Sequence, residues 1–562
     1  MVRKLKKGII IVPAVLALAA GGFFGYRWYS EKKAWKEELK KRETLYVSSD
    51  QLTVQIANKE TGETIDIPRG TQLEVRVVPY KDEETEQEYR IAYIEDTEYL
   101  MTQDQLCTEL KDAVKEAGGF VKLPAVLYAE GSGPSIQSML AKGSAAEIAG
   151  FANILPDGSV DRYLVSADGQ QGYIRSEYLV RSESEVDYNI PEVHQGRENR
   201  FGGGNAYTLE YPVLEKGNFE DNPMPREVRT LYLNRGCIST IDDYIDIANN
   251  SGINAFIIDM KESDGPAYKS EVIRQYSPTS YERGYNSMED YKAAVQKCKD
   301  AGIYVIGRIV TFKDDYYAMD HPEYCLMNIS TGNPYVLAGA RWPSPYQRAV
   351  WEYNIRLAIE GVEEIGFNEI NFDYIRFPDK IAKSFNNIDF RNDYEETMAQ
   401  AINRFLFYAR DELHERHVYL SADVFGETSN DYVAAYGQYW PMMSNVADVM
   451  CGMPYPDHFN IHDYGISQAV WEVPGTLLKY WGKYVMERQN ETPSPAKVRT
   501  WIQGYDTYWK EPKVTYNVDK INEQIDGLYS SGLNDGYMVW NAPSELWRYR
   551  SYMSAFRERV TE

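Results

Sequence analysis

The feature that most constrains the fold is a regular alternation, from residue 226 onward, of short apolar runs and longer amphipathic stretches. One such stretch, residues 346–366, repeats its apolar positions at spacings of three and four, which is typical of a helix. Eight β-strands, each followed by a helix or loop, predict a (β/α)8 TIM barrel over residues 226–562. A doubly wound sheet is the alternative, but the sequence shows no glycine-rich phosphate loop. The predicted strands are residues 228–236, 253–261, 303–312, 368–378, 417–426, 447–456, 498–505 and 536–543.

Acidic residues stand near the carboxyl ends of three of these strands, which is where the chemistry of such barrels takes place. Side chains alternate between the two faces of a strand, so Ile370 and Phe372 on the helix-facing side turn Asp373 toward the barrel axis. The same alternation turns Asp423 inward on the fifth strand and Asp259 inward on the second. The three acids are therefore predicted to lie at matching heights at the top of the barrel.

Carboxylates that share a cleft repel each other, so one of them holds a proton near neutral pH while another stays ionised. Glycosidic cleavage uses this division, because one acid protonates the leaving oxygen while a second carboxylate attacks the sugar or activates water. We therefore predict a glycoside hydrolase with Asp373 as nucleophile or base and Asp423 as acid. Glu427, four residues beyond Asp423, is the alternative acid.

Four ordered motifs carry a resemblance to a known family: NFDYIRFPD (371–379), SADVFGE (421–427), ADVMCGMPYP (447–456) and YMVWNAP (537–543). Over residues 226–550 the chain resembles bacterial glycoside hydrolases that are classed as a domain of unknown function and are distantly similar to alpha-amylase-type TIM barrels. The resemblance implies a nucleophilic aspartate at the end of the fourth strand and an acid/base carboxylate at the end of the fifth, where Asp373 and Asp423 stand.

The sequence departs from the amylase-like pattern, which has glutamate on the fifth strand and arginine two residues before the nucleophile. Position 371 is asparagine here, and Arg376 follows Asp373 by three residues. Arg376 either forms a surface ion pair with Asp379 or holds Asp373 ionised by its charge. Arg308, at the end of the third strand, has a similar pair of interpretations. The roles of the individual acids therefore stay open at this point.

Further polar and aromatic residues at the strand ends suit a sugar ring, which needs an aromatic floor and hydrogen-bond donors. Each of them has an equally plain interpretation as a core residue. His458 and His462 are able to bind a metal, bind substrate or hold their loop; no metal and no cofactor is predicted. The predicted substrate-binding residues are Asp259, Arg308, Arg376, Tyr455, Gln503, Tyr505, Trp540 and Asn541.

Two segments of alternating strand pattern precede the barrel, at residues 44–107 and 121–182, and their endings correspond. We interpret them as a duplicated small all-β domain. The second copy, with Lys142-Gly143 before a strand and a closing GYIRSEYL, resembles bacterial SH3-like domains. That resemblance implies peptidoglycan or a surface glycan as a partner, and a plain spacer is the alternative. Residues 183–225 are polar and are predicted to form a linker whose aromatics can pack on the barrel.

The amino-terminal residues 1–30 are predicted to be a membrane anchor or signal segment. Four basic residues, Arg3, Lys4, Lys6 and Lys7, precede Gly8–Tyr26, which carries no charge and is near the minimum length for crossing a bilayer. This pattern predicts a single-pass transmembrane helix in the cell membrane with the bulk of the chain outside the cytoplasm. Ala17-Leu18-Ala19 resembles a signal-peptidase site, so secretion after cleavage is the alternative.

A formal net charge of −24 argues against nucleic acid as a partner, because phosphate binding needs a basic face. The function predicted from the sequence is therefore extracytoplasmic cleavage of a cell-wall or environmental polysaccharide. Two alternatives remain. One is a non-catalytic cell-surface protein that binds glycans, and the other is a metal-assisted hydrolase such as a polysaccharide deacetylase.

Overall fold

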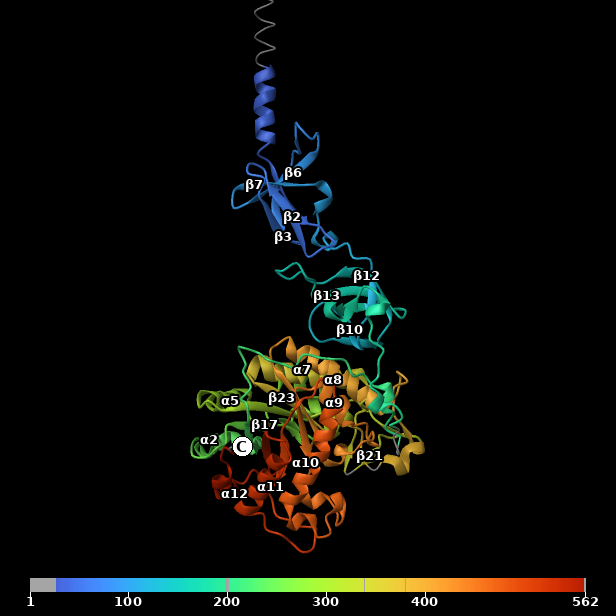
Figure 1. Cartoon of the computed structure of the whole chain (residues 1–562), viewed down its shortest axis with the longest axis vertical. Coiled ribbons are helices and arrows are strands. Elements are labelled where there is room, and N and C mark those ends of the chain that lie inside the picture. Colours follow the sequence, from blue (N-terminus) through green and yellow to red (C-terminus); the bar gives the residue numbers. More distant parts are fainter. Residues whose placement is uncertain (1–26, 198–201, 338, 380, 560–562) are drawn as a thin grey trace, which may run out of the picture. The chain divides into compact units, whose positions relative to one another are not determined.

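The computed structural model describes residues 27–197, 202–337, 339–379 and 381–559 of the chain (Figure 1). The chain divides into two compact units. The first takes in the described residues of Met1–Gly119 together with Ala145–Arg181, and the second takes in those of Phe120–Ser144 and Ser182–Glu562. Strands dominate the first unit, whereas the second contains a parallel sheet with helices around it.

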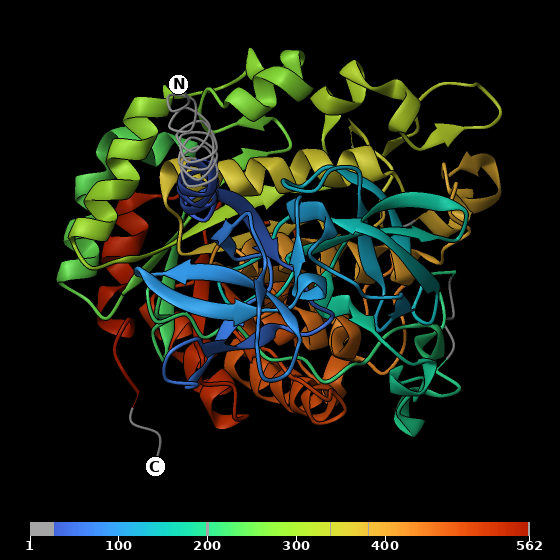
Figure 2. The same ribbon diagram turned by 90° about the horizontal axis from the view of Figure 1, so that it is seen from above.

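The amino-terminal strands form a curled antiparallel sheet, drawn in blue in Figure 2. Its order is β3-β2-β7-β6-β4-β1-β8, with β5 paired to β6. Alternate residues of these strands, among them Val47, Ile56 and Val75, point into one apolar core. The strands are β1 (Arg42–Val47), β2 (Thr53–Asn58), β3 (Thr64–Pro68), β4 (Gln72–Arg76), β5 (Tyr80–Lys81), β6 (Glu88–Ile94), β7 (Thr97–Met101) and β8 (Leu106–Cys107).

The second all-β segment repeats strand pairings of the first. In the first segment β2 and β3 form a hairpin, and β4, β6 and β7 form an antiparallel meander. In the second, β10 and β11 form a hairpin, and β12, β13 and β14 form a meander. Both segments are therefore all-β, whereas their origin in a duplication and their likeness to SH3 domains stay predictions. The strands are β9 (Gly119–Val121), β10 (Ala125–Tyr128), β11 (Ile136–Leu140), β12 (Ala145–Phe151), β13 (Arg162–Ala167), β14 (Gln170–Arg175) and β15 (Leu179–Val180).

The carboxy-terminal strands form a parallel sheet that curves into a nearly closed barrel. Its order is β27-β26-β25-β23-β19-β17-β16-β29-β28. Seven of the eight predicted strand ranges each overlap one of these strands, and the range 498–505 overlaps two, β27 and β28. The observed strands are β16 (Val228–Leu233), β17 (Ala255–Glu262), β19 (Tyr304–Val310), β23 (Glu369–Asp373), β25 (Tyr419–Phe425), β26 (Val449–Met453), β27 (Lys497–Val498), β28 (Thr500–Gln503) and β29 (Gly536–Trp540).

The predicted closed (β/α)8 barrel needs correction at its seventh strand. This strand is broken in two, because β27 pairs with β26 and β28 pairs with β29. The break falls at Arg499, whose side chain turns into the barrel and places Nη1 2.7 Å from Oε1 of Glu369. The barrel is therefore nearly closed rather than complete.

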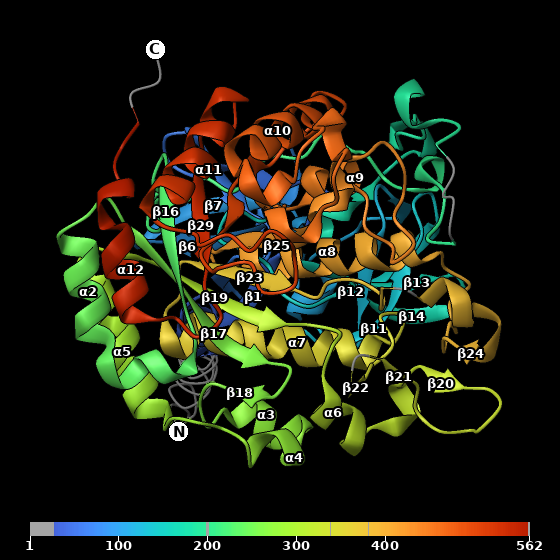
Figure 3. The ribbon, with the colours of Figure 1, turned by 90° about the horizontal axis from the view of Figure 1, so that it is seen from below.

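Helices cover the outside of this barrel and form its outer layer in Figure 3. Phe405 of α8 packs on Phe372 of β23 with ring centroids 5.3 Å apart. Phe372 is thus an example of a helix-facing strand residue that packs against the outer layer of helices. The helices are α2 (Ile241–Asn249), α3 (Glu271–Tyr276), α4 (Pro278–Tyr281), α5 (Met288–Asp300), α6 (Asp315–Asp320), α7 (Arg348–Glu360), α8 (Met398–His414), α9 (Trp440–Val446), α10 (Pro474–Asn490), α11 (Val518–Ser530) and α12 (Leu546–Tyr552).

Short strands also occur in the loops at the barrel ends. β18 pairs with β17, β20 pairs with β24, and β21 pairs with β22. Their bounds are β18 (Gly265–Pro266), β20 (Met327–Asn328), β21 (Val336–Leu337), β22 (Ala340–Arg341) and β24 (Ile388–Asp389).

The barrel interior is a packed core, and the predicted linker helps to close it. Phe219 and Met224, both from residues 183–225, pack against the interior cluster. Between them, Asn222 donates from Nδ2 to the carbonyl oxygens of Asn368 at 2.9 Å and His417 at 2.7 Å. Residues 217–224 therefore belong to the barrel's packing. The interior cluster consists of Val228, Tyr232, Ala255, Ile257, Tyr304, Ile306, Tyr419, Val449, Cys451, Tyr455, Trp501 and Met538.

The transmembrane helix in the predicted fold also needs correction. Over residues 27–197, 202–337, 339–379 and 381–559, no helix has the length and apolar character that crossing a bilayer requires. The segment predicted to be the anchor, Gly8–Tyr26, lies outside the described residues. The described amino-terminal region consists of a helix over residues 27–38, followed by β-sheets with short helical turns (Figure 1).

We expect the ion pair inside the barrel to matter strongly for stability. Arg499 and Glu369 are about 1% and 0% exposed, and Tyr304 also donates to Glu369 at 3.1 Å. The Glu369→Gln variant leaves the buried guanidinium of Arg499 without its counter-charge, which costs about 3–5 kcal/mol. Urea unfolding monitored by tryptophan fluorescence measures this loss.

The matched control is Asp243→Asn, which breaks a solvent-exposed pair with Arg550. An exposed pair of this kind contributes less than about 1 kcal/mol. Equal losses of stability in the two variants would contradict the assignment of Arg499–Glu369 as a structural pair of the barrel.

Candidate active site

The two acids predicted to be catalytic lie on adjacent strands at the same level. Asp373 is the last residue of β23, and Asp423 lies in β25. The strand register pairs Phe372 with Ala422, so the residue that follows each of them is one of the acids. Both carboxyl groups line one cavity of about 480 Å³ at this end of the barrel. The inward direction expected from strand alternation is therefore observed for both.

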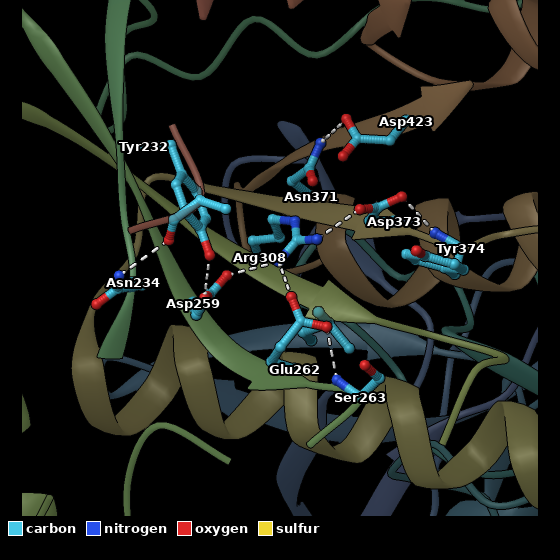
Figure 4. Close-up of polar contacts among 12 residues, drawn as sticks. Tyr232, Asn234, Asp259, Glu262, Ser263, Arg308, Asn371, Asp373, Tyr374 and Asp423 are labelled. Atoms are coloured by element: carbon cyan, nitrogen blue, oxygen red, sulfur yellow. Dashed lines mark hydrogen bonds and ion pairs between the residues drawn. The ribbon is translucent and has the colours of Figure 1, made fainter. Parts of the chain in front are cut away.

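The guanidinium of Arg308, from β19, lies at the centre of the site (Figure 4). Its Nη1 donates to Oδ1 of Asp259 at 2.6 Å and to Oε2 of Glu262 at 3.0 Å. Its Nη2 donates to Oδ2 of Asp373 at 2.6 Å. Because the side chain is only 2% exposed, these charge-assisted hydrogen bonds act in a medium of low dielectric constant. One buried cation therefore fixes three carboxyl groups.

Asp259 helps to fix the position of the Arg308 side chain. It accepts a hydrogen bond from the hydroxyl of Tyr232 at 2.5 Å, and its backbone carbonyl accepts one from Tyr291 at 2.6 Å. Burial raises the pKa of Asp259 to about 6, and the positive charge of Arg308 opposes that rise. Asp259 does not line the cavity that Asp373 and Asp423 share. The structure therefore places it as a support of Arg308, although the sequence predicted it to bind substrate.

Asp423 differs from Asp373 in its surroundings, because its hydrogen-bond partners are neutral side chains rather than an arginine. Oδ1 accepts from Nε1 of Trp501 at 2.9 Å and from Nδ2 of Asn371 at 3.0 Å. Oδ2 is buried and has no hydrogen-bond partner within the part of the chain that the structure describes. Burial, followed by the nearby charge of Asp373, raises the pKa of Asp423 well above its ordinary value. Asp423 is therefore the carboxyl group of this site that is suited to hold a proton.

Aromatic side chains form much of the cavity wall. Trp540 packs on Tyr232 with ring centroids 4.3 Å apart and meets Trp501 edge-on at 5.5 Å. Of the residues predicted to bind substrate, the cavity is lined by Arg308, Arg376, Tyr455, Tyr505, Trp540 and Asn541. Gln503 is buried beneath the wall, where it donates to the backbone carbonyl of Tyr505 at 3.0 Å.

Arg376 does not pair with Asp373, and Glu427 does not lie in the cavity with the two acids. Arg376 donates to the carbonyl oxygen of Phe377 at 3.0 Å and lies 3.4 Å from Oδ1 of Asp379, so the charge beside Asp373 comes from Arg308 instead. Glu427 does not line the cavity. Its two oxygens accept hydrogen bonds from the tyrosine hydroxyls of residues 432 and 436, at 2.8 and 3.1 Å.

A family model described as "Putative glycosyl hydrolase domain" matches residues 231–546, which is more than half of the chain. The chain belongs to this family. The matched residues contain the whole site, including Arg308, Asp373 and Asp423. The family resemblance predicted from the sequence motifs is therefore confirmed at the level of a glycosyl hydrolase domain.

Three solved structures are similar to parts of this family member. A hypothetical protein from Ruminiclostridium thermocellum ATCC 27405 is 33% identical over 34% of this chain and 97% of its own, with a TM-score of 0.30. The PgaB (BpsB) glycoside hydrolase domain from Bordetella bronchiseptica is 11% identical over 59% of this chain and 100% of its own, with a TM-score of 0.42. The noncanonic maltogenic alpha-amylase AmyB from Thermotoga neapolitana is 13% identical over 59% of this chain and 70% of its own, with a TM-score of 0.37. No curated protein matches the chain.

Sequence reasoning missed Glu262, which lines the cavity of this glycosyl hydrolase domain. The register of β17 against β19 shifts between Asp259 and Lys261, so simple alternation fails there. Lys261 turns away to pair with Asp314 at 2.7 Å, and Glu262 reaches Arg308. Burial acts to raise the pKa of Glu262, but Arg308 and the hydrogen bonds from Ser263 outweigh it and lower the pKa.

Trp501 was also missed, and its signal was present in the sequence. It lies in the predicted strand 498–505, two residues before Gln503, so alternation along the strand places Trp501 on the same face as Gln503, which was predicted to bind substrate. Its indole N–H then reaches Asp423 across the barrel interior.

The raised pKa of Asp423 predicts how stability depends on pH. A carboxyl group whose pKa is raised on folding favours the folded state while protonated, and this contribution is lost as pH rises through the folded-state pKa. Asp423→Asn mimics the protonated form, so we expect its Tm to exceed that of the wild type at pH 8. The difference should be about 2 °C for each unit by which folding raises the pKa.

Thermal unfolding between pH 4 and pH 9 measures this difference. We expect it to disappear toward the ordinary aspartate value of 3.8, where the wild type is protonated as well. Asp300→Asn, at the exposed end of α5, is the control and should show no such trend. A Tm difference for Asp423→Asn that does not change with pH would contradict the assignment.

Proposed function

We propose that this protein is a glycoside hydrolase that cleaves a cell-wall or environmental polysaccharide by a two-carboxylate mechanism. One observation carries the proposal: a single cavity contains both a buried acid whose hydrogen-bond partners are neutral and a carboxylate that an arginine holds in place. Asp423 and Asp373 are these two groups. Membership of a glycosyl hydrolase domain family supports the same reaction class.

Asp423 is the general acid of this mechanism. Near neutral pH a raised pKa keeps a fraction of this group protonated, and an acid must carry a proton before it can give one to the leaving oxygen. Both neutral donors contact Oδ1. This leaves Oδ2 as the atom that carries the proton and delivers it to the glycosidic oxygen.

Asp373 is the nucleophile or the base. Oδ2 accepts from Arg308, and Oδ1 accepts from the backbone N–H of Tyr374 at 2.6 Å. These two donors fix the orientation of the carboxylate and compensate its negative charge. An attack on the sugar, or on the proton of a water molecule, needs an oriented carboxylate of this kind.

The cavity supports a sugar as the substrate. Its volume of about 480 Å³ falls in the range of small-molecule sites, and its walls combine aromatic rings with a few polar groups. Trp540 and Tyr455 offer aromatic rings for a pyranose ring, and the guanidinium of Arg376 adds hydrogen-bond donors to the same wall. Peptidoglycan as the polymer and a location outside the cytoplasm stay predictions.

The test is the release of new reducing ends by residues 31–562 from a panel of bacterial wall and plant glycans. We expect release by the wild-type protein, and a fall in kcat/KM of about 10²–10⁴-fold or more in Asp373→Asn and Asp423→Asn. Wild-type kcat/KM should fall as pH rises through the pKa of Asp423, because the acid then loses its proton. Glu427→Gln is the matched control, since Glu427 lies outside the cavity.

Two outcomes would overturn the proposal. A large loss of activity in Glu427→Gln, together with an active Asp423→Asn, would move the acid role to Glu427. Binding of a glycan without any release of reducing ends, unchanged in Asp373→Asn, would identify a non-catalytic glycan-binding protein instead.

A further inference from the structure

Two aromatic side chains that line the active-site cavity are largely open to water. Tyr508 and Trp509 follow β28, and they are 61% and 58% exposed. Trp501 and Tyr455, which line the same cavity, are 1% and 8% exposed. The aromatic wall therefore continues from the buried part of the cavity out onto the surface.

Trp509 is held in place although it is exposed. Its Nε1 donates to the carbonyl oxygen of Asp457 at 3.2 Å. Its ring meets His458 edge-on, with centroids 5.7 Å apart, and lies 6.3 Å from the ring of Tyr505. The indole is thus fixed at its polar edge, while more than half of its surface faces solvent.

The loop that carries the two rings is also tied at its base. The backbone N–H of Thr507 donates to the carbonyl oxygen of Val514 at 3.0 Å, and the N–H of Val514 donates to Oγ1 of Thr507 at 2.6 Å. The N–H of Tyr516 donates to Oδ1 of Asp506 at 2.8 Å. A ring presented by such a loop binds a partner at low entropic cost, because little freedom remains to be lost.

We propose that Tyr508 and Trp509 form an outer sugar-binding subsite that stacks against a polysaccharide chain as it leaves the cavity. The inference rests on the proposed glycoside hydrolase function. A cavity of about 480 Å³ encloses a ligand of small-molecule size, so the rest of a polymer has to cross the rim. A rigid ring with an apolar face and a bonded polar edge suits the apolar face of a sugar.

The consequence is a preference for chain length. A short substrate that binds only in the buried part of the cavity, beside Trp501 and Tyr455, does not reach the exposed rings, whereas a polymer gains one more stacked unit. The subsite therefore contributes to kcat/KM on polymers and not on short oligosaccharides, which makes Trp509 a specificity-determining residue.

The test compares Trp509→Ala with the wild type on soluble starch, partially deacetylated chitin and solubilised peptidoglycan, and on the disaccharides of the same polymers. We expect kcat/KM on the cleaved polymer to fall about tenfold, the equivalent of about 1.4 kcal/mol, while the rate on its disaccharide changes less than twofold. Trp509→Phe keeps a ring and should recover most of the loss.

Trp547→Ala is the matched control, because Trp547 is 62% exposed at the start of α12 and does not line the cavity. Equal losses on polymer and disaccharide in Trp509→Ala, or the same polymer-specific loss in Trp547→Ala, would overturn the subsite. Affinity electrophoresis in gels containing each polymer measures binding without turnover. It therefore tests the subsite separately from catalysis, and unchanged retardation of Trp509→Ala would also refute it.

Discussion

The site depends on one buried cation shared by three carboxyl groups. Arg308 contacts Asp259, Glu262 and Asp373, and a buried guanidinium needs hydrogen-bonded carboxyl partners of this kind to offset the cost of its desolvation. The strands have to deliver these groups in register for this to happen, and β17, β19 and β23 are consecutive neighbours in the barrel. The parallel sheet therefore does more than hold the acids near each other, because it brings the cation that fixes their orientation.

The two central acids differ because Arg308 forms a hydrogen bond with only one of them. Arg308 donates directly to Asp373, whereas the partners of Asp423 are the neutral side chains of Asn371 and Trp501. A negative charge next to a buried acid favours the protonated form, so the ionised Asp373 adds to the effect of burial on Asp423. Two aspartates of equal intrinsic chemistry thus have the different environments that the proposed proton donor and the proposed nucleophile or base need.

Alternation within strands predicted the direction of Asp373 and Asp423, because both lie in regular stretches of strand. It failed at Glu262, since the register shift in β17 changes which residues point inward, and a sequence pattern does not reveal such a shift. It also failed to anticipate the break at Arg499, whose side chain pairs with a residue 130 positions away. Periodicity therefore predicts local geometry, whereas register shifts and contacts between distant residues lie outside what it can predict.

The departure from the amylase-like pattern at position 371 has a physical explanation. Nδ2 of Asn371 lies 3.0 Å from Oδ1 of Asp423, so an arginine at this position would bring a positive charge close to the acid. That charge would favour the ionised form of Asp423 and oppose its role as a proton donor. With asparagine at 371, the cation comes from β19 and approaches the site from the side of Asp373. The cation of this site is therefore Arg308, and Asp423 keeps the neutral partners that suit its proposed role as a proton donor.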